Sequence, residues 1–181
     1  MADAENNSPA QPLGLSLDLT YVAQQDRIRL TMRQAGIAPV DWWWTRRMTL
    51  RVLQLWVDKL DAVPLPDLPS LPWLSVPGKR DLAQEHALSL EFDGPQGQKQ
   101  PLLETEKTYL LTTVHLNVGA TDCSLQMVAG QASVRLSFTR REAHAMLEAI
   151  ALQARQAHWL DSVSLPAWLG VSGQAPPAGD P

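Results

Sequence analysis

The stretch from residue 27 to residue 60 reads RIRLTMRQAGIAPVDWWWTRRMTLRVLQLWVDKL. Its first part alternates apolar and polar residues, with Ile28, Leu30 and Met32 on one side, which is typical of a half-buried strand. A second apolar run at residues 40–44 predicts another strand. From Thr45 onward the apolar residues recur every three or four positions, which indicates a helix with a broad buried face. Together with an alternating run at residues 15–21, the stretch predicts three strands followed directly by a helix.

A second stretch repeats this order further along the chain. Residues 132–156 read ASVRLSFTRREAHAMLEAIALQARQ, and Thr139 is followed by two arginines as Thr45 is. Both threonines are candidate helix N-caps, and Glu142 completes a capping-box pattern with Thr139. The exits are also similar, with LDAVPLP at residues 60–66 and LDSVSLP at residues 160–166. Such self-similarity predicts an internal duplication. The alternative is convergent strand and helix patterning with chance identity in short motifs.

We therefore expect an α+β fold built as a tandem pseudo-repeat of strand-strand-strand-helix units, with antiparallel sheets and two helices packed on one side. The first βββα unit covers residues 14–63, and residues 64–84 form a proline-rich crossover. The second unit covers residues 85–171 and gains an extra strand at residues 86–92, which makes it ββββα. Residues 1–13 and 172–181 are predicted to be disordered tails.

Composition and charge exclude several classes of protein. The chain has 181 residues, 45% of them hydrophobic and 19% charged, which is typical of a folded domain. The net charge of −4 provides no overall attraction to nucleic acid or to an anionic membrane. No signal peptide and no membrane-spanning stretch are visible. Cys123 is the single cysteine, so no internal disulfide is possible. We expect a cytoplasmic protein.

The tryptophans suggest an interaction surface. Trp42, Trp43 and Trp44 are consecutive, so a strand through them would point two indole rings to one side and one to the other. One side can belong to the core, whereas the other needs a cover from the same chain or from a partner. Tryptophan is enriched in protein interfaces. The candidate interface residues are Trp42, Trp43, Trp44, Trp73 and Trp168.

The arginines suggest a second kind of surface. The helix starts carry the pairs Arg46-Arg47 and Arg140-Arg141, where free backbone N–H groups suit an anion. The competing interpretation is that these arginines bridge to carboxylates of the same chain. A separate set, Arg27, Arg29 and Arg33, falls on one side of a predicted strand and is the candidate surface for nucleic acid.

Signals for catalysis are sparse. The four histidines form none of the zinc-binding spacings, and no metal or cofactor site is expected. His144 and Glu148 lie one helical turn apart, which we interpret as a solvated surface pair. Cys123 has no neighbouring basic residue in the sequence that would lower its pKa, so we expect no nucleophilic thiol.

The sequence favours a non-enzymatic subunit or adaptor that binds another protein, or a second copy of itself, through aromatic or sheet-edge surface. The first alternative is an accessory factor that binds nucleic acid through the arginine-rich strand. The second alternative is an enzyme whose site is dispersed along the sequence.

Overall fold

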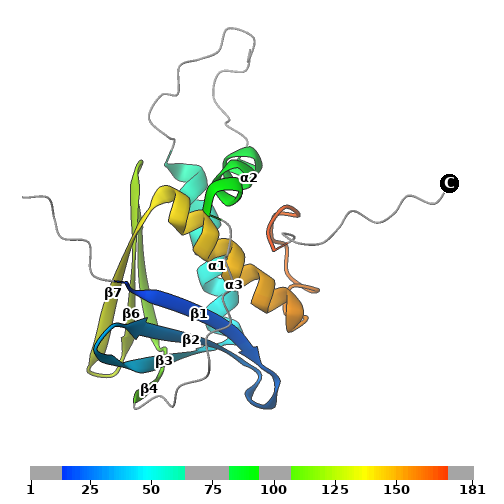
Figure 1. Ribbon diagram of the computed structural model, residues 1–181. Coiled ribbons are helices and arrows are strands. Elements are labelled where there is room, and N and C mark those ends of the chain that lie inside the picture. Colours follow the sequence, from blue (N-terminus) through cyan, green and yellow to red (C-terminus); the bar gives the residue numbers. More distant parts are fainter. Residues whose placement is uncertain (1–13, 64–81, 94–106, 171–181) are drawn as a thin grey trace, which may run out of the picture.

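Two β-sheets and three helices form the described part of the protein, which comprises residues 14–63, 82–93 and 107–170 of the computed structural model (Figure 1). The predicted α+β class is confirmed. Sheet A contains β1 (Ser16–Val22), β2 (Arg27–Gln34), β3 (Ile37–Thr45) and β4 (Lys107–Leu110). Sheet B contains β5 (Thr113–Val118), β6 (Asp122–Ala129) and β7 (Ala132–Thr139). The helices are α1 (Arg46–Ala62), α2 (Leu82–Asp93) and α3 (Arg140–Gln156).

Both sheets are mainly antiparallel meanders in sequence order. In sheet A, β1 pairs with β2 and β2 with β3, and β4 joins β3 in parallel. In sheet B, β6 lies between β5 and β7. Strand β4 belongs to sheet A although it directly precedes β5 in the chain. Leu111 donates its N–H to the Trp43 carbonyl, and the chain then crosses to sheet B.

The tryptophan strand has two different faces, as the alternation predicts. Trp42 and Trp44 are 2% and 0% exposed and pair with Leu30 and Ile28 on the inner face of sheet A. Trp43 points to the outer face and is only partly buried. The Arg29 guanidinium lies 5.9 Å from the Trp43 ring. Trp42 and Trp44 are therefore core residues, and Trp43 is the most exposed of the three.

Threonine caps start both long helices. Thr45 accepts a hydrogen bond from the Met48 N–H at 3.3 Å, and Thr139 accepts one from the Glu142 N–H at 3.2 Å. Glu142 in turn accepts from the Thr139 N–H at 2.7 Å, which completes the predicted capping box. Each cap follows a strand without a loop, so the strand direction sets the direction of the helix.

The two long helices lie on the inner side of both sheets (Figure 1). α1 contacts β2 and β3 of sheet A and β5 of sheet B, whereas α3 contacts β6 and β7 of sheet B and β1 of sheet A. Each helix thus joins its own sheet to the other one, and the described residues form a single core. Its largest fully buried side chains include Trp44, Trp56, Trp159, Leu53, Leu147 and Ile150.

The additional strand expected at residues 86–92 is wrong, because these residues belong to helix α2. Leu88 and Leu90 suggested a period of two, but the residues that face the core are the polar His86 and Ser89. The second unit therefore has three strands of its own, and neither α2 nor β4 has a counterpart in the first unit. The duplication itself stays a prediction.

Several sequence predictions lie outside the described residues. They are the disordered tails, nearly all of the proline-rich crossover at residues 64–84, and the interface residue Trp73.

We expect Thr139→Ala to lower the free energy of unfolding by about 1 kcal/mol, because the Glu142 N–H loses its acceptor. Thr139→Ser keeps the hydroxyl and serves as the control. Urea unfolding of both variants checks the expectation. An equal loss in both would mean that the methyl group, and not the cap, matters.

Trp44→Ala should destabilise the protein by about 3–5 kcal/mol, since it empties a fully buried indole site. Trp43→Ala should cost only about 1 kcal/mol, which is the size of an exposed cation–π contact. Thermal unfolding of the two variants gives the comparison. Similar losses would contradict the assignment of the two faces.

Candidate functional site

A buried polar network joins α2 to α3. We use this name for five side chains: Glu85 and His86 from α2, and Arg140, His144 and Glu148 from α3. His144 and Glu148 are completely buried, and the other three side chains are at most 11% exposed. Buried charges are stable only when each one is paired and hydrogen-bonded. The network meets this condition.

Arg140 uses all five of its N–H donors. Its Nε donates to Glu85 Oε1 at 2.6 Å and one Nη2 hydrogen donates to Glu85 Oε2 at 3.2 Å. The remaining three donate to the carbonyls of Leu60, Val63 and Gly119 at 3.0, 2.7 and 3.2 Å. The first two carbonyls belong to the C-terminal end of α1, where a cation is favoured. Internal bridging is therefore the interpretation that the contacts of Arg140 support.

Glu85 is ionised because its partners outweigh its burial. Burial alone would raise the pKa of this carboxyl, but hydrogen bonds from His144 and Arg140 lower its pKa to about 2. The His144 Nε2 lies 2.9 Å from Glu85 Oε1. A carboxylate in this state is a fixed negative charge between two donors.

The two histidines face each other. His86 Nδ1 lies 3.1 Å from His144 Nδ1, and His86 Nε2 lies 3.0 Å from Glu148 Oε2. The same Glu148 oxygen accepts the Gly170 N–H at 2.7 Å. The Trp168 ring lies against His86 with the ring centroids 4.6 Å apart. The network thus also contacts the residues that follow α3.

This network is a structural centre with little access for a substrate. Its described members contact one another and backbone groups, and no group of three or more potential metal ligands occurs among the described residues. The interpretation of His144 and Glu148 as a solvated pair is wrong, because both are fully buried. The pattern that could have indicated this burial lies in α2, where the polar residues Glu85, His86 and Ser89 share one helical face.

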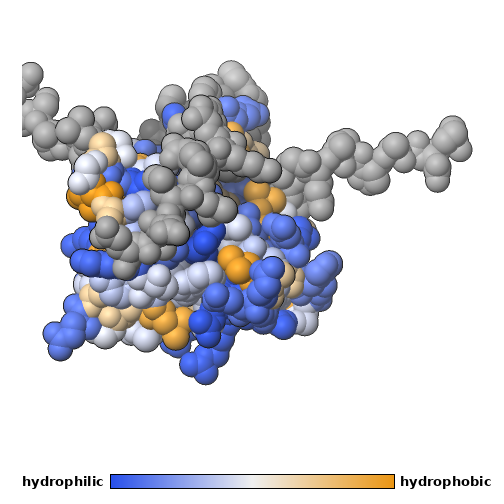
Figure 2. Space-filling view, turned by 60° about the horizontal axis from the view of Figure 1, so that its bottom comes forward, coloured by the Kyte–Doolittle hydropathy of each residue, from blue (hydrophilic) through white to orange (hydrophobic). Residues whose placement is uncertain are grey.

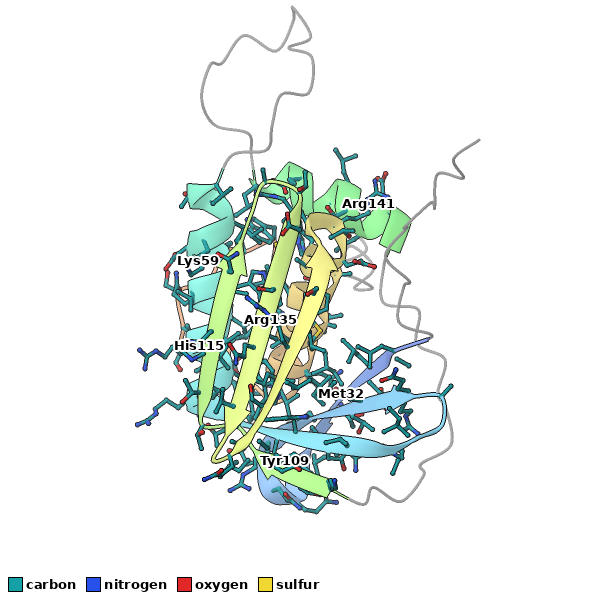
Figure 3. The ribbon with its side chains drawn as sticks, turned by 90° about the vertical axis from the view of Figure 1, so that its left-hand side faces the viewer. Met32, Lys59, Tyr109, His115, Arg135 and Arg141 are labelled. Atoms are coloured by element: carbon teal, nitrogen blue, oxygen red, sulfur yellow. The ribbon has the colours of Figure 1, made fainter. Side chains whose placement is uncertain are left out.

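A groove opens where the two sheets meet away from the helices. Its floor is the inner face of sheet A, with Met32, Val40, Trp42 and Tyr109, and one wall is the β6–β7 hairpin. Its volume is about 440 Å³. Met32 and Tyr109 lie beside the end of this hairpin (Figure 3).

The rim of the groove is apolar and basic. Leu15 and Ile37 are 39% and 59% exposed, which is unusual for large aliphatic side chains in contact with an apolar floor. Arg33 and Lys107 also line the groove, and its described lining contains no carboxylate. The groove therefore favours an apolar occupant with negative charge near it.

Strand β7 presents an open edge beside this groove. Among the described residues, β7 forms backbone pairs with β6 alone. Ala132 pairs with Ala129 across the Gly130-Gln131 turn, so alternate residues from Ser133 onward direct their N–H and C=O groups away from β6. By contrast, α3 covers part of the edge of β1, where Gln153 accepts the Tyr21 N–H at 2.7 Å.

Two of the three arginines of β2, Arg27 and Arg29, are partly buried on the outer face of sheet A. Arg33 is 9% exposed and lines the groove, at the register shift between Met32 and Gln34. Asp18 and Asp41 lie on the outer face, and Asp41 accepts a hydrogen bond from Thr31 at 2.6 Å. Figure 2 brings this side of the molecule forward and shows hydrophilic residues around separate apolar areas. The basic charge of the strand is thus offset by acidic neighbours.

The other predicted site residues are dispersed. Arg46 contacts Ser162 Oγ at 3.5 Å, and Arg47 and Arg141 are exposed at the starts of α1 and α3. Of the two predicted anion sites, the pair Arg46-Arg47 is exposed at the start of α1, whereas in the pair at the start of α3 Arg140 is turned inward. Trp168 is partly buried against His86.

Cys123 is buried on β6. Burial raises the pKa of its thiol above the usual range, which opposes the formation of a nucleophilic thiolate.

At neutral pH, Glu85→Gln should destabilise the protein by up to about 3 kcal/mol, because the wild-type carboxyl has a pKa near 2 instead of 4.5. This contribution is fully present above pH 4.5 and is lost as the pH falls through the folded-state value. The difference between wild type and variant should therefore shrink toward pH 2. Urea unfolding at several pH values, with Glu91→Gln on the exposed side of α2 as control, tests this. A difference that stays constant with pH would contradict it.

None of the helices in the described ranges is long and apolar enough to cross a membrane. Comparisons of the chain with protein-family models, with curated proteins and with solved structures found no match.

Proposed function

We propose that this protein binds an extended segment of another protein, which adds to the edge of β7 as a further strand. The observation that carries this proposal is the open edge of β7 next to an apolar groove. Strand addition obtains affinity from backbone hydrogen bonds and specificity from pockets for alternate side chains.

The side chains around β7 define the partner. Ala132 and Val134 line the groove, so apolar residues of the added strand would enter it on this side. Arg135 projects from the outer face of sheet B (Figure 3) and is exposed. The alternate residues of the partner would face Arg135 and are expected to be acidic, since opposite charges on adjacent strands attract.

A strand edge that no partner covers can pair with other chains and cause aggregation. Proteins blunt such edges with charges, proline, bulges or a covering element, because unpaired N–H and C=O groups recruit other chains. On β7 the exposed side chains are short or carry a single charge, namely Ser133, Arg135, Ser137 and Thr139. The edge is therefore available for pairing on the sheet that forms the groove wall.

Binding of a labelled peptide tests the proposal. The probe is a fluorescein-labelled nonapeptide in which valine and glutamate alternate, and its control has the same composition arranged in two blocks. We expect fluorescence anisotropy to detect binding of the alternating peptide to the wild-type protein and much weaker binding of the control.

Ser133→Pro should weaken binding about tenfold or more, because proline removes an N–H from the open edge. Ser133→Ala keeps that N–H and should bind like wild type. Ile37→Ser should also weaken binding, whereas Leu88→Ser, at a comparably exposed leucine on α2, should not. Circular dichroism confirms that each variant is folded.

Failure of the wild type to bind, or equal binding by Ser133→Pro, would overturn the proposal. Sedimentation of the free protein shows whether a second copy of the chain, and not another protein, occupies the edge of β7. A dimer that Ser133→Pro dissociates would mean that a second copy of the chain pairs with β7 and that the site serves self-association instead.

A further inference from the structure

The buried network contains three hydrogen bonds in series, and each of them needs one proton. They join Glu85 to His144, His144 to His86, and His86 to Glu148, at 2.9, 3.1 and 3.0 Å. The six atoms in the series comprise four ring nitrogens and two carboxylate oxygens. Two neutral histidines supply only two N–H groups. The geometry therefore requires one proton more than two neutral rings provide.

The position of this third proton follows from Glu148. Its Oε2 accepts the Gly170 N–H at 2.7 Å and faces His86 Nε2. The Gly170 N–H is a fixed donor, and a hydrogen bond donated to a carboxyl oxygen favours the carboxylate form. With Glu148 as the carboxylate, the third proton belongs to the histidine pair, and the two rings together carry three N–H groups and one positive charge.

Among the five side chains of the network, the charges then cancel. Glu85 and Glu148 contribute two negative charges, and Arg140 and the histidine pair contribute two positive ones. Neutrality matters here because an uncompensated charge in a buried site is strongly destabilising. The count leaves no acceptor without a donor along the series.

We propose that His86 and His144 form a proton-binding site whose one shared extra proton fastens α2 and residues 166–170 to α3. α2 contacts α3 through this network, and the residues after α3 contact it through Trp168 and Gly170. The site is distinct from the groove and does not depend on its function.

The charged and titratable groups of the described residues around the site come from three elements. From α2 there is Glu85, and from α3 there are Arg140 and Glu148. On β6, Cys123 is coupled electrostatically to Arg140 and Glu85, and also to its neighbour Asp122. Arg155 Nη2 donates a hydrogen bond to the Leu169 carbonyl at 2.9 Å. The carbonyls at the C-terminal end of α1 accept hydrogen bonds from Arg140.

Docking of α2 should weaken both when the histidine pair loses its extra proton and when it gains a further one. Removal of the extra proton leaves one contact of the series without a hydrogen. This is either the contact between the two ring Nδ1 atoms or the contact between His86 and Glu148. A fourth ring proton makes two N–H groups oppose each other between the rings. Docking of α2 should therefore be strongest at an intermediate pH and should weaken as the proton is lost on the alkaline side.

Nitrogen NMR of the full chain measures the number of ring protons directly. Because His115 and His158 are exposed, His115→Asn and His158→Asn remove their signals and leave those of the network. At pH 8 a free imidazole is mostly neutral, because its pKa is about 6.5. We expect three protonated nitrogens among the four in the two rings. Two protonated nitrogens at pH 8, with α2 still docked, would overturn the proposal.

Hydrogen exchange of the amides of α2 provides the second readout. Glu148→Gln removes the negative charge that balances the extra proton, so it should reduce the ring protons to two. It should also speed exchange in α2 about tenfold to hundredfold, the equivalent of one charged hydrogen bond. Glu91→Gln, on the exposed side of α2, should change neither. Unchanged ring protons and unchanged exchange in Glu148→Gln would reject the site.

Discussion

The guanidinium of Arg140 is the contact on which the arrangement of the helices depends. Its five donors reach the C-terminal end of α1, the turn between β5 and β6, and Glu85 of α2. A buried carbonyl or carboxylate that loses its donor costs more free energy than a hydrogen bond contributes. Because the guanidinium is planar and its donors are fixed, it holds the elements in one geometry.

The network around Arg140 explains why α2 turns a polar face to the protein. The helix buries Glu85, His86 and Ser89 and leaves Leu88 48% exposed. Packing of this kind contributes little hydrophobic energy. It is selective, however, since a shifted or rotated α2 would leave ionised groups without partners. The interface between α2 and α3 is therefore determined by hydrogen-bond and charge pairing more than by apolar area.

The groove follows from the way each helix leaves its sheet. α1 begins directly after β3 at Thr45 and α3 directly after β7 at Thr139. Both helices cover the ends of the sheets at which they start, and the opposite end of sheet A, near Gln34 and Ile37, extends beyond them. The β6–β7 hairpin covers this end only in part. An apolar floor and an open strand edge thus remain side by side.

Local patterns in the sequence determined much of this protein. Alternation in residues 27–33, the helical period after Thr45 and the capping box at Thr139 depend on neighbours a few positions apart, and the structure contains all three. The opposite faces of Trp43 and Trp44 follow from the pleat of a strand. The tertiary structure decided which charges meet. Glu85 and Arg140 are 55 residues apart, and His86 and Glu148 are 62 residues apart. No local period distinguishes such buried polar residues from solvated ones, and this is why α2 resembled a strand and Glu148 a surface residue. The groove has the same origin, because it is lined by four separate strands whose meeting depends on how two sheets pack.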